Sequence, residues 1–191
     1  MFRDKASKII VKRKKTLLFA KNKADTFITA NQTDIRLMEI RKATDNDFIE
    51  ILYLAKAYAE LVPAVGTLNW TANPISEMQL KEAIHLGDLF IVTENLSLGI
   101  LLLNNELPTN EGINTSIINL IIHPVGEKKG CASLLLKFAI QKAEDIGALS
   151  LTIKVPFTHS RCTAALEQLE FQTNTPITDL SSVLLFKKNL A

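Results

Sequence analysis

The chain has 191 residues, of which 47% are hydrophobic, and a formal net charge of +2 that results from 22 basic and 20 acidic residues. This length and this apolar content suit one globular domain and exclude a disordered protein. The longest apolar runs, such as residues 99 to 103, are far shorter than the roughly 18 residues that would suggest a membrane span.

The charge is distributed unevenly along the chain. Residues 1 to 37 contain 10 basic and 3 acidic residues, whereas the remainder contains 12 basic and 17 acidic residues. The basic cluster Lys12 to Lys15 could bind nucleic acid or an anionic membrane surface. We favour a poorly ordered basic extension, or upstream sequence ahead of a natural start at Met38. Nucleic-acid binding is the weakest of these hypotheses, and a secretory signal is excluded because the apolar core is too short.

The two cysteines, Cys131 and Cys162, lie in different segments and have no histidine at metal-ligand spacing. Neither a zinc site nor a disulfide framework is therefore predicted. Isolated thiols of this kind are typical of a reducing compartment. We expect a cytoplasmic protein that holds no metal.

The first predicted elements are a strand and two helices. Apolar and polar residues alternate over Met38 to Ala43, which indicates a strand. Thr44 and Asp47 have the spacing of a capping box and open a helix. Residues 62 to 73 are predicted to form a loop, and loops of this length are often functional. A second helix is predicted from Ile75 to Leu86, where a glycine ends it.

Two strands are predicted next, over residues 89 to 93 and 96 to 104, joined in a hairpin by a turn at Glu94 and Asn95. A loop over residues 105 to 114 leads to the following strand.

The most informative stretch runs from Ile117 to Ala148. Its first residues are nearly all β-branched or large and apolar, as in a strand that is buried on both faces. From Gly130 to Gly147 apolar residues recur at helical spacing, which predicts a helix that begins near Lys129. A helix start stabilises an anion through its unpaired N–H groups and its dipole, and Lys128 and Lys129 add positive charge. The stretch therefore predicts a strand, an anion-binding turn and a helix.

The remaining elements are a strand over residues 149 to 155, a helix over about 160 to 169, and strands near 171 to 177 and 182 to 188. This order of elements resembles that of the GNAT superfamily of N-acetyltransferases over roughly residues 38 to 190. Three segments carry the resemblance: MEIRKATDNDFIEILYLA, HPVGEKKGCASLLL and HSRCTAALEQLEF. The resemblance implies one α/β domain of the α+β type over residues 38 to 191. Its mixed, mostly antiparallel sheet would have about seven strands, flanked by about four helices.

The second segment resembles the acetyl-CoA signature of the family. Gly130 and Ala132 match that signature, whereas Glu127 stands where the family has arginine or glutamine. Small residues at such a turn let the backbone approach the pyrophosphate. The resemblance implies that the residues binding acetyl-CoA are Leu120, Ile121, Ile122, Glu127, Lys128, Lys129, Gly130, Cys131, Ala132 and His159. A glycine turn without any cofactor is the alternative, and a P-loop is disfavoured because no lysine follows Gly130.

The third segment places Leu166 where the family usually has a tyrosine as general acid. Leucine cannot donate a proton, so the candidates to replace the tyrosine include Cys162, His159 and water. A thiol near a helix start can have a lowered pKa, although a buried and inert cysteine is the commoner case. Ser116 occupies the position at which some relatives carry a carboxylate base.

These observations predict transfer of an acetyl group from acetyl-CoA to a primary amine of a small molecule or a peptide. We expect the acceptor to lie near the loop that contains Pro63 to Trp70. The alternative is a catalytically weak or inactive module with the same fold, which binds acyl-CoA or a partner protein. A homodimer is compatible with either hypothesis.

Overall fold

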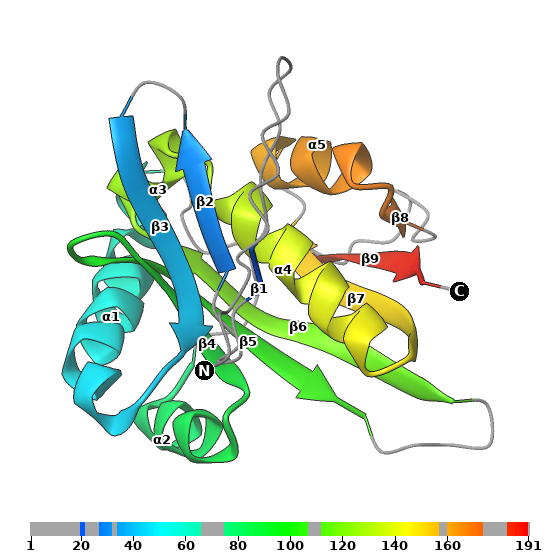
Figure 1. The fold of residues 1–191 in the computed structure, drawn as a ribbon, viewed down its shortest axis with the longest axis horizontal. Coiled ribbons are helices and arrows are strands. Elements are labelled where there is room, and N and C mark those ends of the chain that lie inside the picture. Colours follow the sequence, from blue (N-terminus) through cyan, green and yellow to red (C-terminus); the bar gives the residue numbers. More distant parts are fainter. Residues whose placement is uncertain are drawn as a thin grey trace, which may run out of the picture.

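The computed structural model describes residues 20–21, 27–31, 34–65, 75–106, 112–156, 160–173 and 183–190 (Figure 1). The helices in these ranges are α1 (Phe48–Val65), α2 (Glu77–Leu86), α3 (Pro124–Lys128), α4 (Cys131–Asp145) and α5 (Ser160–Gln168), and a 3-10 turn, η1, spans Asp45–Asp47. The strands are β1 (Ala20–Lys21), β2 (Phe27–Asn31), β3 (Asp34–Lys42), β4 (Leu89–Thr93), β5 (Ser97–Asn105), β6 (Ile113–Ile122), β7 (Ala148–Pro156), β8 (Gln172–Thr173) and β9 (Val183–Asn189).

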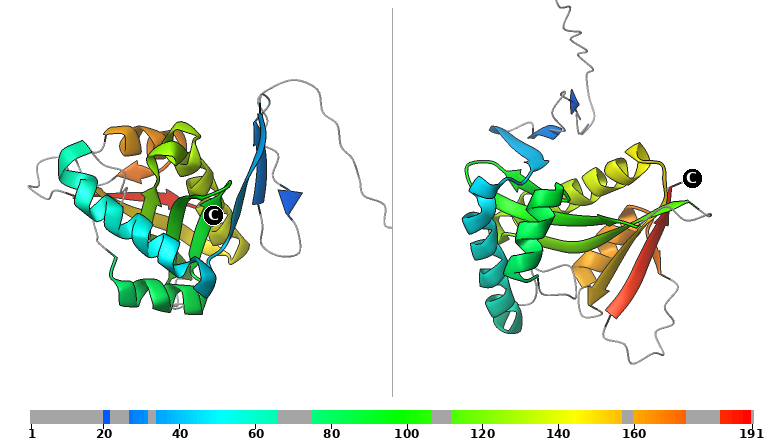
Figure 2. Two further views of the ribbon diagram at one scale, coloured as in Figure 1. Left: turned by 90° about the vertical axis from the view of Figure 1, so that its left-hand side faces the viewer. Right: turned by 90° about the horizontal axis from the view of Figure 1, so that it is seen from below.

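All described strands belong to one sheet, in the order β1-β2-β3-β4-β5-β6-β7-β9-β8. Only β6 and β7 pair in parallel, and the other neighbours are antiparallel. The seven strands from β3 to β9 confirm the predicted mixed, mostly antiparallel sheet. β2 lies along the outer edge of β3, at the margin of the molecule (Figure 2).

The sheet separates two hydrophobic clusters, because successive side chains on a strand point to opposite faces. On β4, Phe90 and Val92 join the cluster that α4 and α5 cover, whereas Leu89 and Ile91 join the cluster under α1 and α2. Phe90 meets Phe138 of α4 edge-on, with ring centroids 4.8 Å apart. The helices therefore lie on both faces, with α1 and α2 side by side (Figure 2).

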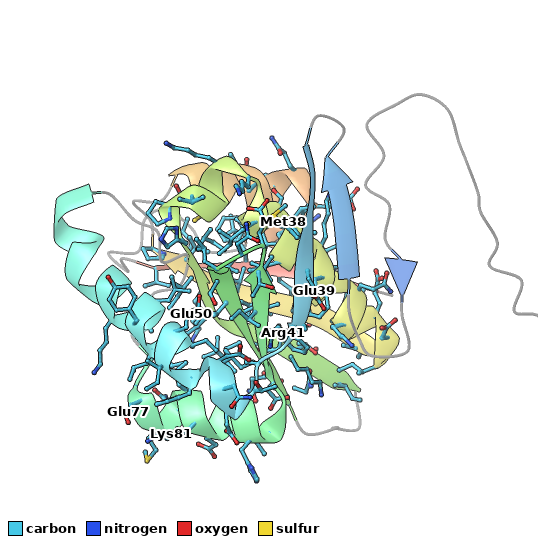
Figure 3. The ribbon with its side chains drawn as sticks, turned by 60° about the vertical axis from the view of Figure 1, so that its left-hand side comes forward. Met38, Glu39, Arg41, Glu50, Glu77 and Lys81 are labelled. Carbon is cyan, nitrogen blue, oxygen red and sulfur yellow. The ribbon has the colours of Figure 1, made fainter. Side chains whose placement is uncertain are left out.

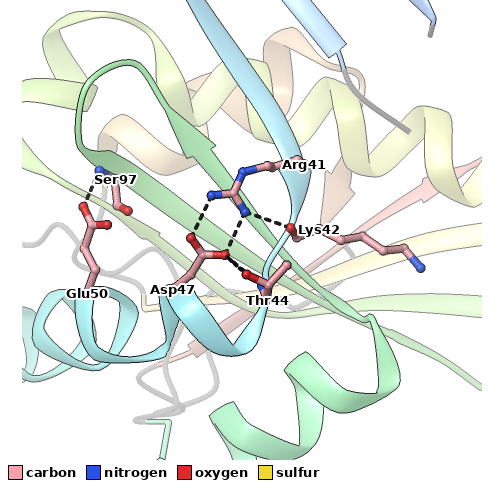
Figure 4. Close-up of polar contacts among 6 residues, drawn as sticks. All are labelled: Arg41, Lys42, Thr44, Asp47, Glu50 and Ser97. Atoms are coloured by element: carbon pink, nitrogen blue, oxygen red, sulfur yellow. Dashed lines mark hydrogen bonds and ion pairs between the residues drawn. The ribbon is translucent and has the colours of Figure 1, made fainter. Parts of the chain in front are cut away.

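Charged and capping side chains fix where α1 and α2 begin. The carboxylate of Asp47 accepts two hydrogen bonds from the Arg41 guanidinium, both at 2.7 Å, and two from the backbone N–H and hydroxyl of Thr44 (Figure 4). The predicted capping box of Thr44 and Asp47 is therefore confirmed. Ser76 caps α2 by accepting from the Gln79 N–H, and Gly87 ends that helix with φ of +75°. Exposed side chains of α2, such as Glu77, lie on the side away from the sheet (Figure 3).

Asp47→Asn is expected to lower the free energy of unfolding by about 2 kcal/mol at pH 7, because the partly buried contact with Arg41 loses the carboxylate charge. The Arg41 hydrogen bonds hold the pKa of Asp47 well below its usual range. The stabilisation is therefore complete above pH 4 or so, the pKa of an unfolded aspartate, and is lost as the pH falls further. Urea unfolding at pH 7 and pH 3 measures this, and the difference from wild type should shrink at pH 3.

Asp45→Asn is the matched control, since Asp45 lies exposed in the same 3-10 turn. Its effect on unfolding should stay within about 0.5 kcal/mol at both pH values. Equal effects of Asp45→Asn and Asp47→Asn would contradict the role given to the Arg41 pair.

Several element boundaries differ from the prediction. α1 continues to Val65, so the predicted loop over residues 62 to 73 begins too early. Pro124–Lys128 forms a short helix in place of a turn, and α4 begins at Cys131 and not at Lys129. Pro124 occupies the first helical turn, where its missing N–H costs nothing, and His123 Nδ1 accepts from the Val125 N–H at 3.1 Å.

Other predictions concern segments that the structure describes only in part. β3 begins at Asp34, inside the predicted basic extension. Trp70 and the cluster Lys12 to Lys15 lie outside the described residues. The division of the chain at residue 37 stays a prediction. None of the helices in the described ranges combines the length and the apolar character needed to cross a lipid bilayer.

Candidate functional site

The parallel strands β6 and β7 pair over only part of their length. Their register runs from Ile113 opposite Ala148 to Ile117 opposite Ile153. Beyond this point β6 continues to pair with β5, and β7 pairs with β9. Among the described residues, no strand pairs with the β7-facing edge of Ile118 to Ile122. Unpaired backbone N–H and C=O groups of a strand edge can bind an extended, amide-containing ligand.

A β-bulge marks the point where the two strands part. Leu103 lies opposite Ile117 and Leu102 lies opposite Asn119, so Ile118 is an extra residue on β6. A bulge bends its strand and increases the local twist. The bend therefore accounts for the end of the β6–β7 pairing directly after Ile117.

The start of α4 follows the end of β6 in the chain, with the short helix α3 between them. The first intrahelical bond of α4 joins the Leu134 N–H to the Gly130 carbonyl at 3.1 Å. The N–H groups of Cys131, Ala132 and Ser133 precede that bond and point out of the helix end. Gly130 has φ of +77°, and a Cβ built on it would meet nothing within 4 Å. The turn therefore offers backbone donors, positive dipole and space for an anion.

Gly126 allows this turn to pack closely against the sheet. A Cβ built on Gly126 would lie 2.5 Å from the Leu98 carbonyl oxygen of β5 and 3.2 Å from Cys131 Sγ. The Leu98 carbonyl also accepts a hydrogen bond from the His123 N–H at 2.8 Å. Only glycine permits this close approach, so α3 is held directly against the backbone of β5.

Polar side chains from two other parts of the chain contact the turn between β4 and β5. The carboxylate of Glu94, whose side chain is 10% exposed, forms an ion pair with the ammonium group of Lys129. On the other side Glu50 of α1 accepts a hydrogen bond from the Ser97 N–H at 2.7 Å (Figure 4). Lys129 is thus directed toward the β4–β5 turn, and its charge is neutralised there.

The structure places most of the predicted acetyl-CoA residues around this site. Leu120, Ile121 and Ile122 end β6, and their side chains are buried, so they could contact a ligand only through the backbone. Cys131 and Ala132 are buried at the start of α4 in the same way.

The remaining predicted ligands differ in their exposure. Lys128 is exposed, and Gly130 forms the accessible corner of the turn. Glu127 is half-buried and faces α5, where its charge contributes to raising the pKa of the Cys162 thiol. His159 lies outside the described residues.

Of the two alternatives for Cys162, the structure agrees with the buried and inert cysteine and not with a lowered pKa. Its side chain is buried in the core, and burial, followed by the charge of Glu127, raises the pKa of the thiol. Burial likewise raises the pKa of Cys131 to about 11. Both thiols therefore stay protonated near neutral pH and are poor acids or nucleophiles. Leu166 is fully buried in the same core.

Local sequence patterns predict neither the Glu94–Lys129 pair nor the bulge at Ile118. The pair joins residues far apart in the chain, and the bulge depends on the register between β5 and β6. Ser116, which the resemblance places where some relatives carry a carboxylate base, accepts a hydrogen bond at Oγ from the Thr152 hydroxyl at 3.1 Å. Within the described ranges, no three His, Cys, Asp or Glu side chains gather as a metal site would require.

No family model and no curated protein sequence matches the chain. Its backbone is nevertheless similar to those of solved acetyltransferases. A GNAT-family acetyltransferase from Listeria monocytogenes has a TM-score of 0.65 at 12% identity, over 81% of this chain and 95% of that chain. An N-acetyltransferase from Staphylococcus aureus has a TM-score of 0.58 at 20% identity, over 80% of this chain and 98% of that chain.

A third similar structure is the NatC complex bound to Gag peptide and CoA, with a TM-score of 0.61 at 15% identity, over 78% of this chain and 95% of the matched chain. The likeness in each case extends over nearly the whole of the other chain. It agrees with the resemblance that the order of elements predicted. The chain therefore has the fold of the GNAT N-acetyltransferases.

Proposed function

We propose that the protein transfers an acetyl group from acetyl-CoA to a primary amine. The observation that carries this proposal is the parting of β6 and β7 after Ile117, next to the open helix start at Gly130. A strand edge that no described strand covers and an anion-binding turn lie at the same end of β6. Acetyl-CoA combines an amide-containing arm with a pyrophosphate, and these are the two chemical groups that such a site would bind. The CoA held by the similar NatC complex supports the choice of ligand.

Each part of the site has a defined role in this proposal. The N–H groups at the start of α4 bind the pyrophosphate, and the exposed Lys128 adds positive charge. The edge of Ile118 to Ile122 pairs with the amide groups of the pantetheine arm as a further strand would. Because Leu120 and its neighbours contribute only backbone atoms, their identity matters for packing and not for recognition.

The reaction needs few side chains. The neutral amine nitrogen attacks the thioester carbonyl carbon, the C–N bond forms and the C–S bond breaks. The amine loses one proton and the departing CoA thiolate gains one, so an amide and free CoA thiol result. A backbone N–H on the β7-facing edge of β6 stabilises the oxyanion. Water carries the proton, since Leu166 has no proton to donate and burial raises the pKa of the Cys162 thiol.

Titration calorimetry with acetyl-CoA, followed by thiol release with a panel of primary amines, tests the proposal. Acetyl-CoA should bind, and at least one amine should increase the rate of thiol release above that of hydrolysis. Binding without amine-dependent release would favour the alternative, a module that senses acyl-CoA or binds a partner. Absence of binding would exclude both functions.

A cytoplasmic location, where Cys131 and Cys162 stay reduced, belongs to this proposal.

Leu166→Tyr is expected to increase turnover about tenfold over Leu166→Phe, because a phenol at this position can protonate the departing thiolate. Leu166 is fully buried, so both aromatic variants add volume to the core and should lose about 1 to 3 kcal/mol of stability. The phenylalanine variant controls for that loss. Equal kcat values for the two variants would mean that proton transfer to sulfur does not limit the rate.

A further inference from the structure

One face of β7 carries polar side chains that no described helix covers. Leu151, Ile153 and Val155 are buried in the cluster that includes α4, so Thr152 and Lys154 point to the opposite face. Thr152 pairs with Ser116 on β6 and with Lys187 on β9, and its hydroxyl donates to Ser116 Oγ at 3.1 Å. We call the residues Ser116, Thr152, Lys154 and Lys187 the lysine face.

The lysine face is open to solvent. The buried cluster under α1 and α2 draws its strand residues from β4, β5 and Ile121 of β6, and it contains none from β7 or β9. Lys154 and Lys187 are both exposed, and Leu185 between them on β9 is 43% exposed. Within the described part of the chain, α1 and α2 thus cover one half of this sheet surface and leave the other half accessible.

The charge on the lysine face is positive and unbalanced. Lys187 lies opposite Thr152 and Leu185 lies opposite Lys154, which makes the two lysines diagonal neighbours on adjacent strands. Four described strand residues that neighbour them on this face, Asn104, Asn114, Ser150 and Asn189, are neutral. Lys188 points to the other face, where it pairs with Glu170. Two adjacent ammonium groups, with no carboxylate at the described strand positions beside them, favour an anion.

The lysine face borders the point where the strands part. Ile153 is the last residue of β7 that pairs with β6, and Lys154 follows it directly. Ser116 precedes Ile117, which is the last residue of β6 that pairs with β7. The turn before α4 lies on the opposite side of the sheet, because α4 covers the other face. An acceptor that approaches from the side of the lysine face would reach a thioester held against β6 without passing the CoA pyrophosphate.

We propose that the acceptor amine carries an anionic group, a carboxylate or a phosphate, which Lys154 and Lys187 bind. This inference rests on the proposed acetyl transfer. The hydroxyls of Thr152 and Ser116 continue the cross-strand row of Lys187 toward β6, where they accept hydrogen bonds from the amine. The face therefore orients the acceptor with its anion on β9 and its nitrogen toward β6.

The test uses the full chain saturated with CoA, which lacks the acetyl group and so permits binding without reaction. Calorimetry compares two pairs of probes that differ in the anionic group: phosphoethanolamine with ethanolamine, and β-alanine with propylamine. One anionic probe or both should bind about fivefold tighter than the neutral partner, since each exposed ion pair contributes less than about 1 kcal/mol. The pair of probes whose affinities differ shows whether the site prefers a phosphate or a carboxylate.

The variant Lys154→Gln with Lys187→Gln should remove this preference. Lys137→Gln is the matched control, because it removes a lysine charge from α4 on the opposite face and should leave the preference unchanged. Equal affinity for both members of both pairs, or a preference that survives in the double variant, would overturn the inference. Failure of the proposed function is seen separately, as an absence of CoA binding in the first titration.

Discussion

Replacing Gly130 with aspartate is expected to weaken acetyl-CoA binding roughly 100-fold while the protein stays folded. Gly130 caps the start of α4 at φ of +77° with open space around its Cα. An aspartate side chain can occupy that space, so the loss comes from charge and bulk placed where the pyrophosphate binds. The folded state itself loses only the cost of a positive φ, about 1 kcal/mol. Calorimetry with acetyl-CoA measures the affinity, and thermal unfolding measures the stability.

Gly147→Asp provides an unusually close control for this variant. Gly147 follows the other end of α4, has φ of +71°, and also has nothing within 4 Å of a built Cβ. The two substitutions therefore share the added charge, the added volume and the backbone strain. Acetyl-CoA should bind the Gly147 variant as tightly as it binds the wild type. If both variants lose affinity equally, the pyrophosphate does not bind at the start of α4.

Gly130→Ala separates the charge of the aspartate from its conformational cost. It carries the same positive φ but no carboxylate, so the loss of affinity should be several times smaller than for Gly130→Asp. An equal loss in the two Gly130 variants would mean that the geometry of the turn, and not electrostatic repulsion, controls binding.

Local patterns were sufficient to predict most of the fold. The strand at Leu89–Thr93 and the capping box of Thr44 and Asp47 depend on neighbours within a few residues, and both occur as predicted. The apolar spacing along α4 also predicted its buried face, with the exception of Ile146, which is 41% exposed beyond the end of the helix. The short helix Pro124–Lys128 was missed, although proline at a first helical position is a signal for it.

The candidate site was harder to predict because it depends on register. No local pattern indicates that β6 leaves β7 after Ile117, or that Ile118 is the bulged residue. The direction of the Lys129 side chain is equally non-local, since Glu94 lies in a different hairpin. A basic residue in an anion-binding turn suggested a phosphate ligand, whereas tertiary structure gives Lys129 a partner within the protein.

This partner leads to the second large expected effect. Lys129→Met should lower the free energy of unfolding by about 3 kcal/mol, because it leaves the 10% exposed Glu94 carboxylate without its counter-charge. Lys128→Met removes an exposed lysine from the same turn and should change the stability by less than about 0.5 kcal/mol. Urea unfolding at pH 7 measures both variants.

The exchanged pair Glu94→Lys with Lys129→Glu should recover a large part of the lost stability, and a double-mutant cycle then gives the coupling energy. Recovery is expected because the two charges still meet, although the hydrogen-bond geometry changes. A double variant that is as unstable as the sum of its single variants would show that the pair contributes nothing beyond separate packing.

Acetyl-CoA affinity in the same variants decides what Lys129 does. If Lys129 acts by holding the turn against the β4–β5 hairpin, Glu94→Gln and Lys129→Met should weaken binding by similar factors, because either change releases the turn. A direct contact between Lys129 and the pyrophosphate predicts a different result, in which Lys129→Met weakens binding but Glu94→Gln leaves it unchanged or stronger. The ion pair and the burial of Glu94 favour the first outcome. Lys129 is then a positioning residue, and the backbone of α4 and Lys128 provide the contacts to the anion.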